Sequence, residues 1–340
     1  MVRVGIIGIG FMGNTHFKIY KKNPKCQVVA ISDEQKARLE GDWSTIVGNI
    51  GEAAMAQVNL RGTATYSRPE DLITRPDVDL VDICVPTNLH ARYALQALEA
   101  GKHVFMEKPI AHTLDDAKSI VKAVRKSARK AAVGHCVRFW PEYAFLKQAV
   151  EENRFGRLWS LHLYRFSATP TWTYGNWMLD HERSGGGGLD LHIHDSDLVL
   201  YLFGKPKKVF SRASKGPSGG WDDISTTYIF DAPVKVTADG GWLGRPNFPF
   251  RMGYEAFFEE ATVEYDMLKA KPLVVYAANG QVQIPAVEAT DGWTVELNYF
   301  IDCIESNREP KTSTIEDARD SLALVLKEFE SAASDKPVSV

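Results

Sequence analysis

A glycine-rich turn near the start of the chain constrains the fold more than any other feature. Gly8-Ile9-Gly10-Phe11-Met12-Gly13 reads GxGxxG, follows the apolar run at residues 2–7 and opens a stretch that predicts a helix. In such a strand–turn–helix unit the first glycine permits the tight turn, and the second lets the backbone approach a pyrophosphate. The third glycine lets helix and strand pack closely. The turn therefore predicts the first unit of a parallel sheet, with a pyrophosphate at a helix N-terminus.

The rest of the first 136 residues continues this pattern, because short apolar runs alternate with longer helical ones. Such alternation is typical of parallel strands joined by crossover helices. Thr113, followed by Asp115 and Asp116, predicts the cap and first turn of one of these helices. The expected strands are residues 2–7, 27–32, 63–66, 80–85, 103–107 and 131–136.

From about residue 157 the runs become strand-like, and several alternate apolar with polar residues. This alternation predicts a sheet with one buried face. The expected fold is an α/β Rossmann domain with a parallel sheet, followed by an α/β domain with a large, mostly antiparallel open sheet. The expected domains are 1–130, 131–313 and a C-terminal helix and tail, 314–340, that returns to the first domain. Strands are expected at 158–166, 207–213, 224–230, 234–238, 256–265 and 273–276, and helices at 294–305 and 315–331.

Composition excludes several classes of protein. The chain has 340 residues, 40 basic and 43 acidic, for a formal net charge of -3, so it shows no electrostatic footprint for nucleic acid or an anionic membrane. Away from the N-terminus, the longest apolar stretch is residues 198–203, too short to span a bilayer. The four cysteines form no CxxC pair and predict reduced thiols. We therefore expect a cytoplasmic protein whose partners are small molecules and copies of itself, as a dimer or tetramer.

An acidic residue at the end of the second expected strand indicates which dinucleotide fits the turn. Asp33 lies 20 residues after Gly13, where its carboxylate can accept hydrogen bonds from ribose hydroxyls and would repel a 2′-phosphate. NAD is therefore favoured. Lys36 and Arg38 lie just beyond Asp33 and could tolerate a phosphate, so NADP stays open. The alternative interpretation is a turn without ligand, with Asp33 as a simple turn residue.

Two further motifs add a family resemblance. Met106-Glu107-Lys108-Pro109 follows the fifth expected strand, and Gly185-Gly186-Gly187-Gly188-Leu189-Asp190 precedes His192, His194, Asp195 and Asp197. Together with the glycine turn, these segments resemble the Gfo/Idh/MocA family of NAD(P)-dependent oxidoreductases, in particular its inositol dehydrogenase-like branch. The resemblance implies an N-terminal Rossmann domain and a C-terminal open sheet that often mediates oligomerisation. It also implies a cis bond before Pro109. The cofactor-binding residues that it suggests are Gly8, Gly10, Phe11, Met12, Gly13, Asp33, Pro86, Thr87, Asn88, His90, Glu107 and Lys108.

The resemblance also implies catalytic roles for Lys108, Asp190 and His194. Oxidation of an alcohol needs a base for the hydroxyl proton, and histidine titrates in the useful range. We expect His194 to be that base, Asp190 to orient it, and Lys108 to hold the substrate oxygen. A lysine before proline is otherwise usually a solvated loop residue. Asp190 and His194 would share a face of a helix, although residues 189–194 also permit a strand; the run to Phe203 and the preceding glycines favour the helix.

A metal site is the main competing interpretation of this segment. His192-Ile193-His194-Asp195-Ser196-Asp197 superficially resembles the HxHxDH run of metallo-β-lactamase-like hydrolases. Ser196 and Asp197 stand where that motif needs Asp and His, and the sequence has no evident second cluster of ligands. We therefore expect no metal. His192 is interpreted as structural or cofactor-facing.

Aromatic and basic residues of the second half suggest a sugar or cyclitol substrate, because rings suit its C–H faces and fixed donors suit its hydroxyls. The expected contacts are Arg138, Arg165, Trp172 and Trp177, together with Lys108, Asp190 and His194. The aromatic residues could equally belong to the core or to an interface. The expected function is an NAD(P)-dependent dehydrogenase of a sugar, polyol or cyclitol. The alternatives are an NAD-dependent glycosidase or eliminase that uses transient oxidation, and a non-catalytic nucleotide-binding sensor, against which the acid–base set argues.

Overall fold

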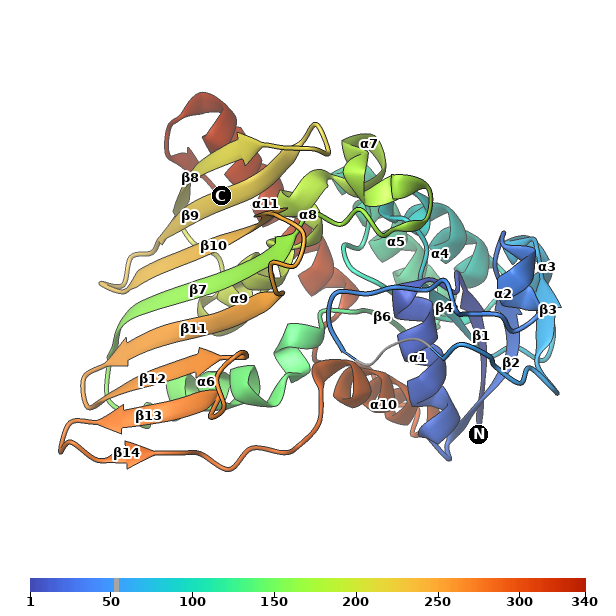
Figure 1. Ribbon diagram of the computed structural model, residues 1–340, viewed down its shortest axis with the longest axis horizontal. Helices are drawn as coiled ribbons and strands as arrows, with labels where there is room; N and C mark the ends of the chain where they lie inside the picture. The colour runs from blue at the N-terminus through green and yellow to red at the C-terminus, as the bar shows by residue number, and fades with distance from the viewer. Residues whose placement is uncertain (52–54) are drawn as a thin grey trace. The chain divides into compact units, whose positions relative to one another are not determined.

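The computed structural model describes residues 1–51 and 55–340, which fall into two compact units (Figure 1). The first unit contains Met1–Cys136, Trp172–Trp177 and Trp293–Arg319. The second unit contains Val137–Thr171, Met178–Gly292 and Asp320–Val340. Each unit is described by itself.

These units differ from the expected domains both inside the chain and at the C-terminus. Residues 131–136, 172–177 and 293–313 were expected in the second domain and group with the first unit. Within the expected tail, residues up to Arg319 group with the first unit, and the chain from Asp320 onward groups with the second. The reason lies in buried contacts of the last helix, where the Ser331 hydroxyl accepts a hydrogen bond from the Ser211 amide at 2.9 Å. The final strand then pairs through Val338 with Val209.

The first unit is built on a parallel sheet. Its strands are β1 (Val2–Ile7), β2 (Cys26–Ser32), β3 (Ala64–Tyr66), β4 (Leu80–Ile83), β5 (His103–Met106) and β6 (Ala131–Val133). Among the described residues the sheet has six strands in the order β3-β2-β1-β4-β5-β6, and every pair is parallel. The predicted Rossmann sheet is thus confirmed. Strand order reverses between β1 and β4, and ligands of such sheets bind beyond the carboxyl ends of the strands at that point.

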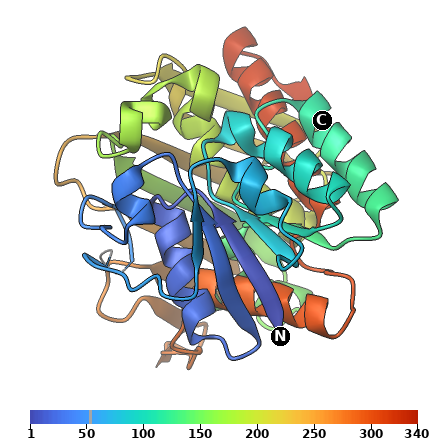
Figure 2. The same ribbon diagram turned by 90° about the vertical axis from the view of Figure 1, so that its right-hand side faces the viewer.

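Helices cover both faces of this sheet (Figure 2). They are α1 (Phe11–Lys22), α2 (Lys36–Leu39), α3 (Pro69–Ile73), η1 (Thr87–Leu89), α4 (His90–Glu99), α5 (Leu114–Ser127) and α10 (Gly292–Glu305). Helices α1 and α10 lie on one face, and α3, α4 and α5 lie on the other. The hydroxyl of Thr113 accepts a hydrogen bond from the Asp116 amide at 3.1 Å, so the predicted cap of α5 is confirmed.

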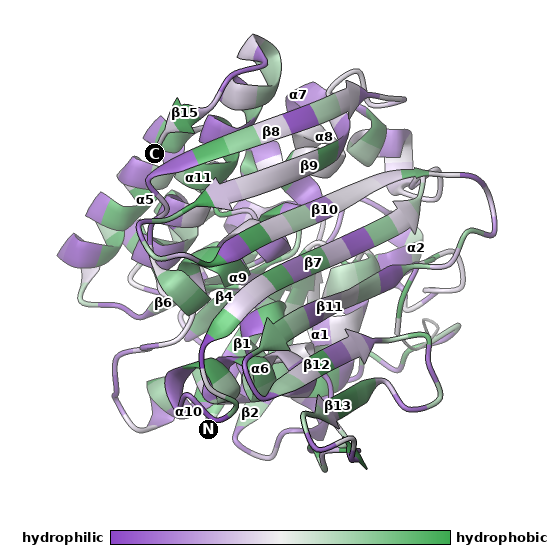
Figure 3. Cartoon of the chain, turned by 90° about the vertical axis from the view of Figure 1, so that its left-hand side faces the viewer, coloured by the Kyte–Doolittle hydropathy of each residue, from purple (hydrophilic) through white to green (hydrophobic). Residues whose placement is uncertain are grey.

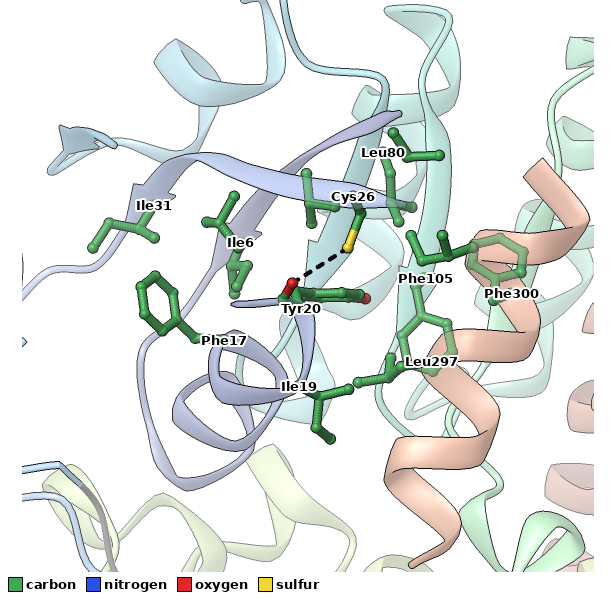
Figure 4. Packing of buried hydrophobic residues seen from close by; sticks show 14 of the residues in the cluster. Ile6, Phe17, Ile19, Tyr20, Cys26, Ile31, Leu80, Phe105, Leu297 and Phe300 are labelled. Atoms are coloured by element: carbon green, nitrogen blue, oxygen red, sulfur yellow. Dashed lines mark hydrogen bonds between the residues drawn. The ribbon is translucent and has the colours of Figure 1, made fainter. Parts of the chain in front are cut away.

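A buried cluster joins α1 and α10 to the sheet (Figure 4). Tyr20 of α1, Phe105 of β5 and Phe300 of α10 are each at most 1% exposed. Cys26 packs beside them, with Sγ 3.5 Å from the Tyr20 carbonyl oxygen. Burying one large apolar side chain contributes about 1.5–3 kcal/mol, so this cluster fixes α1, and with it the glycine turn, against the sheet. All four cysteines are free.

The second unit contains a large sheet. Its strands are β7 (Leu158–Ala168), β8 (Lys208–Lys215), β9 (Trp221–Ile229), β10 (Lys235–Gly244), β11 (Arg251–Phe258), β12 (Ala261–Asp266), β13 (Leu273–Ala277), β14 (Val282–Gln283) and β15 (Val338–Ser339). The described residues give nine strands in the order β14-β13-β12-β11-β7-β10-β9-β8-β15. The pairs are antiparallel except β10 with β7, which confirms the predicted mostly antiparallel sheet.

One expected strand is wrong. Residues 256–265 form two strands, because the chain turns between Phe258 and Ala261. The turn contains neither glycine nor proline, and its amides are satisfied by the segment before β7: Glu259 N donates to Arg157 O at 2.9 Å and Glu260 N to Phe155 O at 3.0 Å. A tertiary contact thus makes a turn that local sequence does not indicate.

Helices of this unit cover one face of the sheet. They are η2 (Cys136–Phe139), α6 (Pro141–Glu151), α7 (His181–Ser184), α8 (Gly186–Asp190), α9 (Ile193–Phe203) and α11 (Ile315–Ser334). The short helix η3 (Tyr174–Leu179) is divided, because its residues up to Trp177 group with the first unit and those from Met178 with the second. Along β7, residues Leu161, Leu163 and Arg165 are buried and alternate with partly exposed ones. Figure 3 shows that hydrophobic and hydrophilic residues are mixed along the strands of this sheet. Helix α9 packs on β7 and β10. In the described part of the chain, no helix has the length and apolarity needed to cross a membrane.

Candidate functional site

The glycine turn has the local geometry that its three glycines predict. A Cβ on Gly8, whose φ is 89°, would lie 2.5 Å from the Cys84 carbonyl oxygen, and one on Gly13 would lie 1.9 Å from the Gly8 oxygen. At Gly10 a Cβ would meet no heavy atom of the described residues within 4 Å. Gly8 and Gly13 are therefore required by packing, whereas the backbone at Gly10 is open to a ligand. The N-cap residue of α1 is Gly10, which has no side chain to cap the helix, so the first turn can receive an anion.

Asp33 lies directly over this turn. Its Oδ2 accepts a hydrogen bond from the Ile9 amide at 2.7 Å, and its Oδ1 accepts one from the Gln35 amide at 2.8 Å. Arg38 Nη1 approaches Oδ2 at 3.2 Å, and both side chains are at most 10% exposed. The carboxylate is therefore fixed at the turn, with Arg38 as its counter-ion. These residues fit NAD, because the open glycine can admit a pyrophosphate and the fixed carboxylate can accept ribose hydroxyls.

The loop after β4 is joined to the turn after β5 by His90. Pro86, Thr87 and Asn88 lie at η1, and His90 begins α4. The His90 ring lies between two carbonyl oxygens, with Nδ1 2.8 Å from that of Pro109 and Nε2 2.8 Å from that of Val85. Burial lowers the pKa of His90. The His90 side chain therefore links the loop after β4 to the turn after β5. A contact between this side chain and the cofactor stays a prediction.

Lys108 begins the turn that His90 braces. Its amide lies 3.2 Å from Glu107 Oε2, its side chain is half-buried, and the peptide bond to Pro109 is cis, as the resemblance implies. Lys108 belongs to the first unit, whereas Asp190 and His194 belong to the second.

A buried polar cluster, which was not predicted from the sequence, lies behind this turn. His16 Nδ1 is 2.8 Å from Asp82 Oδ2, its Nε2 is 3.2 Å from Glu107 Oε1, and Cys84 Sγ is 3.3 Å from Nδ1. Burial opposes a charged ring, but Asp82 and Cys84 outweigh it and hold the pKa of His16 well above its ordinary value. The signal that was available is Asp82 itself, a charged residue within a buried strand.

The same cluster bears on metal binding. One ligand atom each of His16, Asp82 and Cys84 lies within 4.8 Å of the others. Burial raises the pKa of the Cys84 thiol far above its ordinary value, which opposes the thiolate that a metal would bind. A protonated imidazole between two carboxylates accounts for the same contacts. The expectation of no metal stays a prediction.

The glycine run of the second unit is tightly packed. Gly185 and Gly186 have φ values of 81° and 76°, and a Cβ on Gly187 would lie 2.7 Å from the Asp222 carbonyl oxygen. Close packing on β9 thus requires small residues here. The predicted helix is confirmed, but it is interrupted: Asp190 ends α8, and His194 lies in the first turn of α9. The expectation that both lie on one continuous helix is wrong, because the chain leaves regular helix at Leu191 and His192.

Two buried ion pairs hold α9. Arg138 binds Asp197 through Nε and Nη2, both at 2.7 Å, and Arg165 binds Asp195 through the same two atoms, both at 3.0 Å. All four side chains are at most 3% exposed. Paired, planar contacts of this kind fix both position and orientation. Both guanidinium groups already bind carboxylates of α9. Substrate contacts by the two arginines stay predictions.

A third contact holds α9 from the C-terminal helix. His192 Nε2 lies 3.1 Å from Glu328 Oε2, and the Ser196 hydroxyl donates to Glu328 Oε1 at 2.9 Å. Burial opposes the charged ring of His192, but Glu328 outweighs it and raises its pKa. His192 is thus a buried structural residue beside His194, which is one of the two interpretations that the sequence left open.

Both tryptophans expected to contact a sugar lie in a short segment between β7 and α7. Trp172 and Trp177 belong to the first unit, and the Trp172 ring meets the Phe11 ring edge to face, with centroids 5.9 Å apart. A substrate contact by either tryptophan stays a prediction.

The parallel sheet, the open glycine and Asp33 define a dinucleotide-binding protein, joined to a second unit in which Asp190 and His194 are each nearly buried. Residues 2–135 match the family described as "Oxidoreductase family, NAD-binding Rossmann fold", and residues 143–264 match "GFO/IDH/MocA C-terminal domain". The chain belongs to the Gfo/Idh/MocA family of oxidoreductases. The predicted family and the predicted NAD-binding fold are confirmed.

Individual relatives of known name also resemble the chain. The chain is 26% identical to the myo-inositol 2-dehydrogenase of Thermotoga maritima over 336 residues, which cover 95% of this chain and 94% of the relative. It is 31% identical to the levoglucosan dehydrogenase of Pseudarthrobacter phenanthrenivorans over 243 residues, 68% of this chain and 60% of the relative. A solved levoglucosan dehydrogenase in complex with NADH and L-sorbose has a TM-score of 0.84 at 23% identity, covering 100% of this chain and 98% of that one, and shows the same fold.

Proposed function

We propose that this protein is an NAD-dependent dehydrogenase that oxidises a CH–OH group of a sugar, polyol or cyclitol, or reduces the matching carbonyl. The observation that carries the proposal is the presence of three side chains suited to acid–base chemistry: Lys108 after β5, and Asp190 and His194 where α8 meets α9. Asp190 and His194 are 6% and 9% exposed, so each is nearly buried while keeping some access. The names of the relatives, an inositol dehydrogenase and a levoglucosan dehydrogenase, support this substrate class.

The cofactor is held by residues of the first unit. Amides at the start of α1, approached over Gly10, bind the pyrophosphate, and Asp33 accepts hydrogen bonds from the ribose hydroxyls. Bound NAD supplies the nicotinamide that accepts a hydride when an alcohol is oxidised. Arg38 neutralises Asp33 in part, and this keeps a smaller affinity for NADP open.

The substrate proton is moved by residues of the second unit. His194 takes the hydroxyl proton, because an imidazole ordinarily titrates near neutral pH. Asp190 orients that ring and stabilises its protonated form. The Lys108 ammonium holds the substrate oxygen and favours its alkoxide character. General base catalysis of this kind contributes about 10²–10⁴-fold to a rate.

The rigidity of α9 supports this assignment. His194 lies next to Asp195, which Arg165 holds, and two residues from His192, which Glu328 holds. A base must stay within hydrogen-bond reach of its proton, so ion pairs on both sides of His194 suit a catalytic role.

Two other functions make different predictions. Glycoside cleavage through transient oxidation would release an aglycone without net formation of reduced cofactor. A nucleotide-binding sensor would bind NAD and turn over nothing. We also propose a homo-oligomer, a dimer or tetramer, located in the cytoplasm; sedimentation velocity would measure the oligomer directly.

The decisive experiment screens polyols, cyclitols and sugars for NADH formation by the purified protein. The proposal predicts NADH with at least one of them, and weaker or no reaction with NADP. Release of aglycone without NADH would support cleavage instead. NAD binding without reaction across the panel would support the sensor.

A further inference from the structure

The segment 172–177 lies far from the glycine turn in sequence but groups with the first unit. It leaves the second unit after Thr171 and rejoins it at Met178. The segment therefore groups with the first unit although the chain on both sides of it belongs to the second.

One end of this segment lies against the glycine turn. Trp172 meets Phe11 edge to face at 5.9 Å, and Phe11 meets Trp293 of α10 in the same manner at 6.4 Å. A Cβ on Gly48 would lie 2.1 Å from the Phe11 ring, so this ring is enclosed on a further side. Phe11 is the first residue of α1, beside the amides assigned to the pyrophosphate. Trp172 therefore marks the pyrophosphate end of the cofactor site.

The other end lies against the ribose-binding residues. The Arg38 guanidinium lies over the Tyr174 ring, 5.6 Å from its centroid, while Arg38 also pairs with Asp33 at 3.2 Å. Tyr174 is nevertheless 54% exposed. An aromatic ring that is half exposed and stacked on a cation next to the ribose carboxylate offers a face to a planar base.

Backbone geometry presents Tyr174 at the tip of a tight turn. Gly175 and Asn176 have φ values of 59° and 48°, a left-handed conformation that glycine and asparagine tolerate best. The Asn176 amide donates to the Thr173 carbonyl at 2.9 Å and closes the turn. The chain thus reverses just after Tyr174.

We propose that residues 172–177 form a wall of the NAD site that runs from the pyrophosphate to the adenosine, with Tyr174 as a cofactor-binding residue. The wall touches both ends of the site, through Trp172 on Phe11 and Tyr174 on Arg38. Tyr174 also keeps Arg38 beside Asp33, where the guanidinium is less available to a 2′-phosphate. This assigns Trp172 to the cofactor, in place of the sugar contact expected from sequence. The proposal rests on NAD binding and is independent of the substrate.

Binding and amide hydrogen exchange of the whole protein test this proposal. NAD and ADP-ribose, which lacks the nicotinamide, should both protect the amides of 172–177 from exchange. The Tyr174→Ala variant should raise the Kd of both ligands about tenfold, and Tyr174→Phe should restore binding. Tyr174→Ala should also bring the Kd of NAD and the Kd of NADP closer together.

The matched control is Tyr276→Ala on β13 of the second unit, a tyrosine of similar exposure at 43%. It should leave both Kd values unchanged. Wild-type affinity in Tyr174→Ala, or absence of ligand protection over 172–177, would overturn the proposal. Failure of the proposed dehydrogenase function would show differently, as NAD binding with normal protection but no turnover of any substrate.

Discussion

His16 and Asp82 are joined by a hydrogen bond of 2.8 Å between Nδ1 and Oδ2, and neither side chain is exposed. His16 belongs to α1, which follows the glycine turn, and Asp82 to β4. On its other side His16 faces Glu107, the residue before Lys108. One buried imidazole thus connects α1 with the turn that carries Lys108, for which we propose a catalytic role.

This pair predicts a particular dependence of stability on pH. The pKa of His16 is raised in the folded state, so its contribution is full below the unfolded value of about 6.5 and is lost as pH rises through the folded value. His16→Asn leaves two buried carboxylates without a counter-ion, and should lower the free energy of unfolding by about 3–5 kcal/mol near pH 6. Urea unfolding from pH 6 to pH 9 would measure it.

The difference between wild type and His16→Asn should shrink toward alkaline pH. His103→Asn, at the start of β5, is a matched control and should show no such shrinkage, because burial lowers the pKa of His103. A constant difference across the range would contradict a charged His16. Stoichiometric zinc in the purified protein would replace this account with a metal site.

Alanine should have different effects at Gly10 and Gly13: weaker NAD binding at Gly10 and lower stability at Gly13. Gly10→Ala should leave the free energy of unfolding within about 0.5 kcal/mol of wild type, because its Cβ would meet no described heavy atom within 4 Å. It should raise the Kd of NAD about tenfold or more, since the methyl group enters the space for the pyrophosphate. Calorimetric titration with NAD measures this effect.

Gly13→Ala is the complementary change. Its Cβ would lie 1.9 Å from the Gly8 carbonyl oxygen, so backbone must move, and a loss of about 1–3 kcal/mol in stability is expected. If Gly10→Ala unfolded the protein and Gly13→Ala did not, the assignment of roles within the turn would be wrong.

Much of the fold followed from sequence because its signals are local. The glycine turn, the Thr113 cap and the alternation along β7 each report on neighbouring residues, and each predicted its element correctly. The turn at Glu259 and Glu260 could not be predicted in this way, since contacts with the segment before β7 determine it. No local pattern in the sequence indicated the interruption of the helix at Leu191 and His192.

Site residues divide along the same line. Asp33 and Lys108 could be proposed from sequence because they follow strands at motif spacing. The contacts of His16 with Asp82 and of Glu328 with His192 could not be predicted, because the partners are remote in sequence. Arg138 and Arg165 were expected to bind substrate, but no local pattern indicates that a carboxylate of α9 faces each of them.

Asp33 predicts the choice of cofactor. Asp33→Asn removes the charge that repels a 2′-phosphate, and it loosens Arg38, which pairs with that carboxylate at 3.2 Å. The ratio of kcat/KM for NAD to that for NADP should fall by about tenfold or more. An unchanged ratio would mean that other residues select the cofactor. The exposed pair Lys25–Asp302, broken by Asp302→Asn, is a control that should leave the ratio unchanged.

Substitution of Glu328 tests how much its contacts with His192 and Ser196 contribute to stability. Glu328→Ala removes the partner of His192 and of Ser196, both fully buried, and should lower stability by about 3–5 kcal/mol. Glu330→Ala, on the same helix and paired with Lys327 at the surface, should cost less than about 1 kcal/mol. Equal losses in urea unfolding would show that the buried network contributes little.

We propose that His194 removes a proton from a substrate hydroxyl while NAD is bound. The most direct test compares wild type and His194→Ala for NADH formation, with a substrate from the screen and with the Kd of NAD measured in parallel. The account predicts unchanged NAD binding and a kcat lower by about 10²–10⁴-fold. Turnover at the wild-type rate in His194→Ala, with NAD still bound, would contradict it.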